Sequence, residues 1–212
     1  TMLNCISTID TVSAGHIYLD GTDVTEIHPK EIARFRRENL GFIFQDFQLL
    51  DTLTIEENVS LALTINHVPA KEIKARVQNI AQILKITDIL EKYPYQVSGG
   101  QKQRLSIARA IAKHPELFIF DDSFSALDYK TDVALRKALK KKTQDSTVLI
   151  VAQRISTILH AEQIIVLDEG KIAGIGTHRE LLENCEVYRQ IAASQLSESE
   201  LSSSGKEAKA NA

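Results

Sequence analysis

Short apolar runs alternate with helical patterns through most of this 212-residue chain. LFIF at 117–120 and TVLIVA at 147–152 are apolar on both faces, which predicts two strands that are fully buried in a sheet. GFIFQ at 41–45 predicts a third short buried strand. Helices are predicted at 101–113 and 131–142. The alternation of strands and helices therefore indicates an α/β fold with a mostly parallel sheet flanked by helices.

Two further segments predict antiparallel hairpins. Alternating apolar residues flank Asp20-Gly21 within 15–25, and such a dipeptide between apolar runs is a strong turn signal. The segment IIVLDEGKIAGIG at 164–176 has the same organisation. We expect both hairpins to add antiparallel strands at an edge of the sheet.

The sequence also predicts where three helices begin. The chain opens in a helix, TMLNCIS, and Pro29 suits the first turn of a second helix that runs to about Asn39. In THRE, Thr177 and Glu180 have the spacing of a capping box, which predicts the start of the last helix.

Apolar positions recur at helical spacing through 55–92, with Pro69 separating two helices. We expect residues 55–104 to form a helical subdomain. The core of the fold is then assigned to 1–54 and 105–193. Residues 194–212 are small and polar without an apolar period, and we expect them to be disordered.

Composition narrows the function classes. The formal net charge of −3 gives no electrostatic case for nucleic acid as the main partner, and the lysines of KALKKK at 137–142 are interpreted as a solvated helix face. Cys5 and Cys185 have no metal-type spacing and are expected to be reduced thiols. No stretch approaches the roughly 18–20 apolar residues that span a bilayer, so a membrane role requires a separate subunit or domain.

The segment QVSGGQKQR at 96–104 has the features of an anion site. Ser98 can cap the helix that follows. Gly99 and Gly100 lack side chains, so a phosphate could approach the backbone N–H groups at the positive end of the helix dipole. The alternative is a plain glycine loop before a helix.

The second chemical feature is LFIFDDSFSALD at 117–128, where a buried strand ends in Asp121 and Asp122. Ligands of open α/β sheets lie at the carboxyl ends of strands. There, one carboxylate can hold Mg²⁺ and its neighbour can orient an attacking water. The alternative is that both acids are ordinary loop residues.

The order of these segments resembles the ABC ATPase family. VSGGQ, LFIFDD and SALD match its signature loop, Walker B strand and D-loop. FQDF at 44–47 resembles the Q-loop, TVLIVAQR resembles the switch strand, and VLDEGKIAGIGTHRELL resembles the C-terminal hairpin and helix. The resemblance covers residues 1 to about 195.

The resemblance implies a P-loop NTPase-like fold that uses ATP and Mg²⁺. It assigns Asp121 and Gln45 to the metal, and it assigns catalytic roles to Asp122, Gln153 and Gln45. It further implies a set of nucleotide-binding residues, namely Thr1, Ser98, Gly99, Gly100, Gln101 and Asp128.

The resemblance also implies partners. Two such domains sandwich two ATP molecules head to tail, so the expected partners are a second ABC ATPase domain, in a homodimer or heterodimer, and a transmembrane transporter subunit. No nucleic-acid partner is expected. The expected location is the cytoplasmic face of the cell membrane, reached through the membrane subunit.

Three departures from the family pattern bear on activity. TMLNCIS resembles the helix directly after a P-loop, so Thr1 would be the last threonine of a GKTT-like motif. We therefore expect a fragment that binds ATP weakly by itself. Asp122 stands where the family has glutamate, which withdraws the carboxylate by roughly 1.5 Å, and Gln153 replaces the switch histidine and cannot take up a proton. The last two changes resemble the degenerate site of heterodimeric exporters.

Several interpretations stay open. The part up to about Arg104 resembles ATPases of antimicrobial-peptide, lipoprotein and macrolide export, whereas the part from LSIARAI onward resembles exporters with fused domains, so a chimera is one hypothesis. The leading function is an ATPase domain that drives export. The alternative is a non-hydrolytic partner that lends its signature loop to another chain's ATP. ABC-type ATPases of DNA or the ribosome resemble this chain less, because coiled-coil insertions and tandem domains are missing from it.

Overall fold

The computed structural model describes residues 2–123, 139 and 143–196. The chain divides into two compact units, residues 1–151 and residues 152–212, and each is described by itself. The division into a core and a helical subdomain expected from the sequence stays a prediction.

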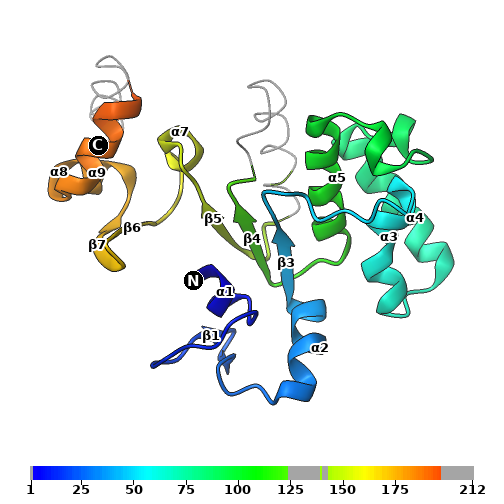
Figure 1. Cartoon of the computed structure of the whole chain (residues 1–212), viewed down its shortest axis with the longest axis horizontal. Helices are drawn as coiled ribbons and strands as arrows, with labels where there is room; N and C mark the ends of the chain where they lie inside the picture. Colours follow the sequence, from blue (N-terminus) through cyan, green and yellow to red (C-terminus); the bar gives the residue numbers. More distant parts are fainter. Residues whose placement is uncertain (1, 124–138, 140–142, 197–212) are drawn as a thin grey trace. The chain divides into compact units, whose positions relative to one another are not determined.

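A three-stranded parallel sheet forms the centre of the first unit (Figure 1). Its strands are β3 (Leu40–Ile43), β4 (Leu117–Asp121) and β5 (Thr147–Val151), in the order β3-β4-β5. Ile43 pairs with Phe120, and Phe120 pairs with Ile150, so all three strands run in the same direction. The predicted α/β class with a parallel sheet is confirmed.

Burial differs sharply between neighbouring strands. In β4, four of five residues are buried, and the two faces belong to two different core clusters. In β5, Val148 and Val151 are 39% and 40% exposed, so the prediction of a fully buried strand there was wrong. The physical reason is position in the sheet, because β5 pairs with β4 alone among the described residues and has no second neighbour to cover it.

Both hairpins form at the predicted turns. β1 (Tyr18–Leu19) pairs with β2 (Thr22–Asp23), and Asp20 and Gly21 have φ values of 46° and 75°, as a tight hairpin turn requires. β6 (Ile164–Asp168) likewise pairs with β7 (Lys171–Gly176). Within the described residues each hairpin is a two-stranded sheet of its own, so neither extends the parallel sheet as we had expected.

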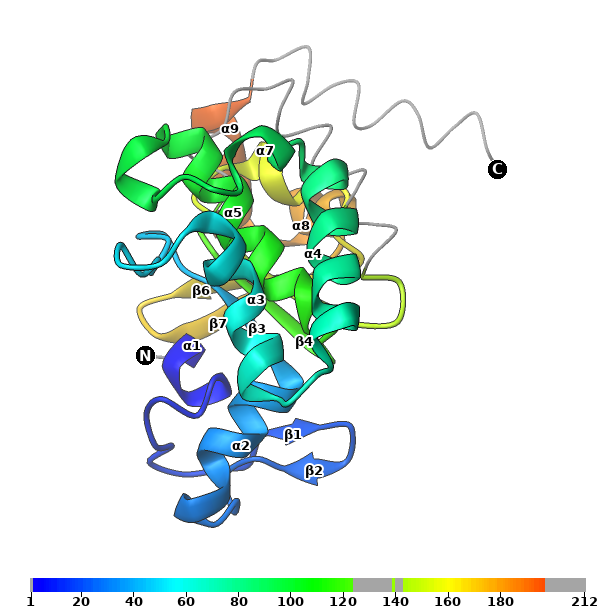
Figure 2. The same cartoon turned by 90° about the vertical axis from the view of Figure 1, so that its right-hand side faces the viewer.

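The helices of the first unit follow the sequence pattern closely. In the described part of this unit they are α1 (Met2–Ile6), α2 (Pro29–Asn39), α3 (Ile55–Ile65), α4 (Ala70–Leu84) and α5 (Gly99–Ala112), with 3-10 turns at Thr87–Ile89 and Pro94–Gln96. Pro29 occupies the first helical position of α2, as predicted. Figure 2 shows α3, α4 and α5 side by side, and all three pack against one another.

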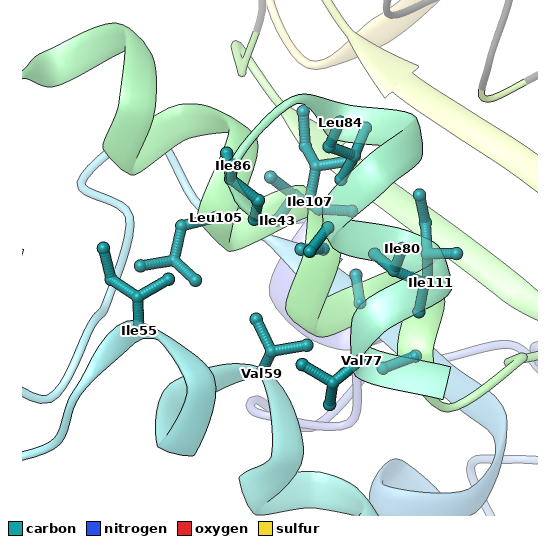
Figure 3. Close-up of a cluster of buried hydrophobic side chains, with 14 of the residues drawn as sticks. Ile43, Ile55, Val59, Val77, Ile80, Leu84, Ile86, Leu105, Ile107 and Ile111 are labelled. Carbon is teal, nitrogen blue, oxygen red and sulfur yellow. The ribbon is translucent and has the colours of Figure 1, made fainter. Parts of the chain in front are cut away.

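The main core lies where these three helices meet the sheet (Figure 3). Ile43 of β3 is fully buried against residues such as Val59 of α3, Leu84 of α4 and Leu105 of α5. Helices and sheet therefore share one hydrophobic cluster, and burial of this apolar surface holds the elements of the site in place.

The second unit has its own core. Its helices are α7 (Ile155–Ile158), α8 (His178–Asn184) and α9 (Glu186–Gln195), which pack with the second hairpin. The predicted Thr177–Glu180 capping box is present. Below it, the buried ring of His178 bonds the Tyr188 hydroxyl at 2.7 Å.

Two predicted segments extend beyond the described residues. α9 continues through Gln195, slightly past the start expected for the tail, and residues 197–212 lie outside the described part of the chain. The predicted helix 131–142 also lies outside it, except for the buried Leu139. Among the described residues, no helix is both long and apolar enough to cross a bilayer.

Candidate functional site

A capped helix start forms the first part of the site. The Ser98 side chain accepts a hydrogen bond from the Gln101 backbone N–H at 3.4 Å, and the Gln101 side chain accepts one from the Ser98 N–H at 2.9 Å. Such a capping box fixes the entry of the chain into α5. The structure thus brings Ser98 and Gln101 together, as expected for the predicted signature loop.

Space is open around the two glycines that follow. A Cβ atom added to Gly99 or to Gly100 would meet nothing within 4 Å apart from its own helix and chain neighbours. Neither glycine has the positive φ that would require its residue type. Packing therefore does not explain these glycines, and the open space would let a ligand approach the first N–H groups of α5.

The carboxyl ends of β3 and β4 form the second part of the site. Because Ile43 pairs with Phe120, these two ends lie next to each other. Asp121 is half-buried as the last residue of β4, and Gln45 is exposed two residues beyond β3. Carboxylate and amide oxygens are ligands that Mg²⁺ accepts, so the donor chemistry at this edge fits the metal that the resemblance implies.

The residues after Asp121 are tightly placed. Asp122 has a φ of 44°, in the left-handed region, and its backbone N–H donates to the carbonyl of Val151 at 3.0 Å. The buried Ser123 hydroxyl donates to the Ile43 carbonyl at 2.8 Å. The strand end that carries the two acids is therefore bonded to both neighbouring strands.

The segment after Gln45 is held by a cation that we did not single out in the sequence. The Arg109 guanidinium, on α5, donates to the carbonyl of Phe47 at 3.1 Å and to the carbonyl of Gln48. Burial lowers the pKa of Arg109. The available signal was a charged residue between Ala108 and Ala110, both of which are buried.

Asn58 is a second residue that we did not single out. It is fully buried on α3, and its side chain bonds the backbone of the loop that leads into that helix. The signal was a polar residue one turn after Ile55, inside an apolar helical stripe.

Gln153 lies in the second unit and is exposed. Its backbone carbonyl accepts a hydrogen bond from the Gln195 side chain at 2.8 Å. The candidates Thr1 and Asp128 lie outside the described residues. Of the candidate set, the structure thus groups Ser98 to Gln101 at one helix start and Gln45, Asp121 and Asp122 at one sheet edge.

Comparison with known proteins assigns the family. The family model described as ABC transporter matches residues 1–125. The chain belongs to the ABC transporter family. The predicted family is confirmed, and the matched residues include the capped glycine turn and the two acids at the end of β4.

Curated members of the ABC transporter family resemble most of the chain. The bacitracin export ATP-binding protein BceA of Halalkalibacterium halodurans is 38% identical over 174 residues, which are 81% of this chain and 69% of that protein. The methionine import ATP-binding protein MetN of Mannheimia succiniciproducens is 34% identical over 187 residues, covering 87% of this chain. The chain spans only 54% of MetN. The relatives thus include both export and import proteins.

Solved ABC cassettes share the fold. The ATP-binding cassette MJ0796, in a dimeric post-hydrolysis state bound to ADP and phosphate, matches with a TM-score of 0.77 and 32% identity. The match covers 83% of this chain and 78% of MJ0796. The chain is therefore an ATP-binding cassette of the P-loop NTPase fold, as predicted.

Proposed function

We propose that this cassette binds ATP with Mg²⁺ and couples ATP binding and hydrolysis to export across a membrane, together with a second cassette and a transmembrane subunit. The observation that carries the proposal is the capped start of α5, where Ser98 fixes the turn and open space surrounds Gly99 and Gly100. A dimeric relative, MJ0796, supports the pairing of two cassettes. On this proposal the chain works at the cytoplasmic face of the membrane.

Two ATP molecules are proposed to be bound. Ser98, Gly99, Gly100 and Gln101 face the phosphates of the ATP held by the partner cassette, and the residues at the sheet edge act on the ATP held by this chain. Bound Mg²⁺ would neutralise phosphate charge, and Asp121 and Gln45 are the residues proposed to hold it. Asp122 is the proposed base that orients water, and Gln153 is proposed to hydrogen-bond the terminal phosphate. Thr1 and Asp128 complete the proposed nucleotide contacts.

Hydrolysis by these residues alone is proposed to be slow. The 212 residues contain no G-x-x-x-x-G-K-[ST] sequence, whose lysine and backbone N–H groups would grip the phosphates. The aspartate and glutamine at 122 and 153 weaken base function in addition. Export, rather than import, rests on the resemblance of the part up to about Arg104 to peptide, lipoprotein and macrolide exporters.

ATP hydrolysis by the full chain, with and without a partner cassette that carries an intact P-loop, tests the proposal. Hydrolysis that depends on both proteins, and that is lost with the partner's P-loop lysine, supports a signature loop working in trans. If the chain neither hydrolyses ATP nor stimulates the partner, the proposed function is wrong.

The second candidate is a non-hydrolytic partner that lends its signature loop to the other chain's ATP. The unobstructed space around both glycines favours it, because lending the loop requires only the start of α5. The two candidates differ in the response to Asp122→Asn when the chain is joined to a P-loop segment and paired with the partner cassette. Loss of hydrolysis supports a catalytic site in this chain, whereas unchanged hydrolysis supports the lending role.

A further inference from the structure

The segment that carries Gln45 has an unfavourable backbone shape. Just after Gln45, Phe47 and Gln48 have φ values of 61° and 50°. Left-handed backbone is uncommon for residues other than glycine, and two such residues in succession persist only when their surroundings hold them.

Three side chains hold this segment from three different elements. At its start, the Ser123 hydroxyl donates to the Ile43 carbonyl at 2.8 Å. At its end, Asn58 donates to the carbonyls of Leu50, Leu53 and Thr54 at 2.9–3.1 Å. In the middle, where the backbone is left-handed, the support is Arg109.

Arg109 differs from the other two supports in its origin and geometry. It projects from α5, the helix that begins at Gly99, and reaches backbone about sixty positions earlier in the sequence. The planar guanidinium donates to two successive carbonyls at once, a fork that the single ammonium of lysine does not reproduce. Because Arg109 is half-buried, these carbonyls also satisfy donors of its guanidinium.

We propose that Arg109 is a positioning residue for Gln45. By holding the carbonyls of Phe47 and Gln48, it fixes Gln45 beside Asp121. It thereby links α5 to the segment that carries this proposed Mg²⁺ ligand. The inference rests on the proposed function for the metal role of Gln45 and Asp121. The support of the Phe47–Gln48 turn by Arg109, called the brace below, rests only on contacts within the first unit.

Hydrogen exchange on the full chain tests the brace independently of activity. The N–H groups of Phe47 and Gln48 are hydrogen-bonded to the carbonyls of Phe44 and Asp46, so they report on the turn. Arg109→Ala should speed their exchange about tenfold or more, and Arg109→Lys should give an intermediate rate. If the alanine variant does not fold, the exchange rates of Arg109→Lys alone test the proposal.

Arg76→Ala is the matched control. Arg76 also reaches from one helix to a carbonyl of another element, donating to Ala112 at 3.4 Å, but it makes no bond to the turn after Gln45. Its removal should leave the exchange of Phe47 and Gln48 unchanged. Equal exchange in wild type and both Arg109 variants would overturn the proposal, as would an equal effect of Arg76→Ala.

Water-proton relaxation of the full chain with Mn²⁺·ATP, at concentrations high enough for the weak binding expected without a P-loop, tests the link to Gln45. Gln45→Ala and Arg109→Ala should each weaken the enhancement severalfold, and the double variant should be no weaker than either single one. Additive losses would show that Arg109 does not act through Gln45, which overturns the positioning role. If wild type shows no enhancement, the proposed metal site fails and the positioning role with it, while the exchange rates still decide whether the brace exists.

Discussion

The side-chain oxygen of Gln195 accepts a hydrogen bond from the backbone N–H of Ile155 at 2.8 Å, across forty positions of sequence. The nitrogen of the same amide donates to the Gln153 carbonyl at 2.8 Å. One side chain near the end of α9 therefore fixes the backbone on both sides of Arg154, where α7 begins. Gln153, the proposed switch residue, takes its backbone position from this amide.

We expect Gln195→Ala to speed hydrogen exchange at the Ile155 amide about tenfold and to lower the stability of the second unit by about 1 kcal/mol, because one part-buried and one exposed hydrogen bond are lost. Gln195→Glu keeps the acceptor for Ile155 but loses the donor to Gln153. Its Ile155 amide should stay protected. Equal exchange in all three proteins would show that α7 starts at Ile155 without this support.

Local chemistry made much of the fold predictable. The turn at Asp20-Gly21 lies where the short-range signal placed it, because a tight hairpin needs residues that tolerate positive φ, and the second predicted hairpin turns at Glu169-Gly170. The exposure of β5 was not predictable in this way. Val148 and Val151 give an apolar strand on both faces, and only its place in the sheet order shows that it lacks a second neighbour within the described residues.

The site was predictable only where its residues are close in sequence. Ser98 and Gln101 have the capping-box spacing, and Asp121 follows directly from the end of an apolar run. Arg109 and Gln195 were missed because their partners lie about sixty and forty positions away. In sequence, each looks like an ordinary polar residue on the outer face of a helix, and only tertiary structure shows which carbonyl it meets.

Because open space surrounds Gly99 and Gly100, a substitution there should change activity without lowering stability. Gly100→Ala should fold with unchanged or slightly higher thermal stability, because alanine favours helix by up to about 1 kcal/mol and the added methyl group meets nothing. Hydrolysis in the mixed assay with a partner cassette should fall at least about tenfold, because the methyl group keeps phosphate from the N–H groups.

Gly41→Ala provides a contrasting control for that experiment. Its Cβ would lie 2.6 Å from a side-chain carbon of Pro115, so this substitution should lower thermal stability instead. A Gly100→Ala protein with full mixed activity would contradict phosphate approach at this turn.

Asp122 has a left-handed backbone conformation, and its carboxylate is the proposed base. Its φ of 44° favours aspartate or asparagine over longer side chains. Asp122→Glu, combined with Gln153→His in a chain joined to a P-loop segment, should raise turnover at least about tenfold by restoring base geometry. The same glutamate should lower stability by roughly 0.5–1 kcal/mol.

Asp122→Asn is the control for this pair, since it keeps the backbone preference and removes the base. It should leave the melting temperature near that of wild type while turnover falls. Turnover that stays unchanged in the glutamate–histidine protein would show that these two positions do not limit hydrolysis.

Lys113, near the end of α5, should make stability depend on pH. Burial, and then the nearby charge of Arg109, lower the pKa of Lys113 to about 8 from its usual 10.5. Between these values the unfolded chain binds the proton and the folded chain does not, so stability rises with pH. Relative to Lys113→Met, the free energy of unfolding of wild type should rise by about 2 kcal/mol from pH 8 to pH 10. Parallel curves from urea titrations of the two proteins would contradict a buried ammonium.

Three cations leave α5 along its length, and each ends on backbone carbonyls of a different element. Arg104 donates to Leu84 and Lys85 at the end of α4, Arg109 to the turn after β3, and Lys113 to Arg36 near the end of α2. The helix spans about 20 Å at 1.5 Å per residue. A displacement of its first turn, for example by a second cassette in contact with Ser98, would thus be transmitted through these side chains to three separate backbone segments.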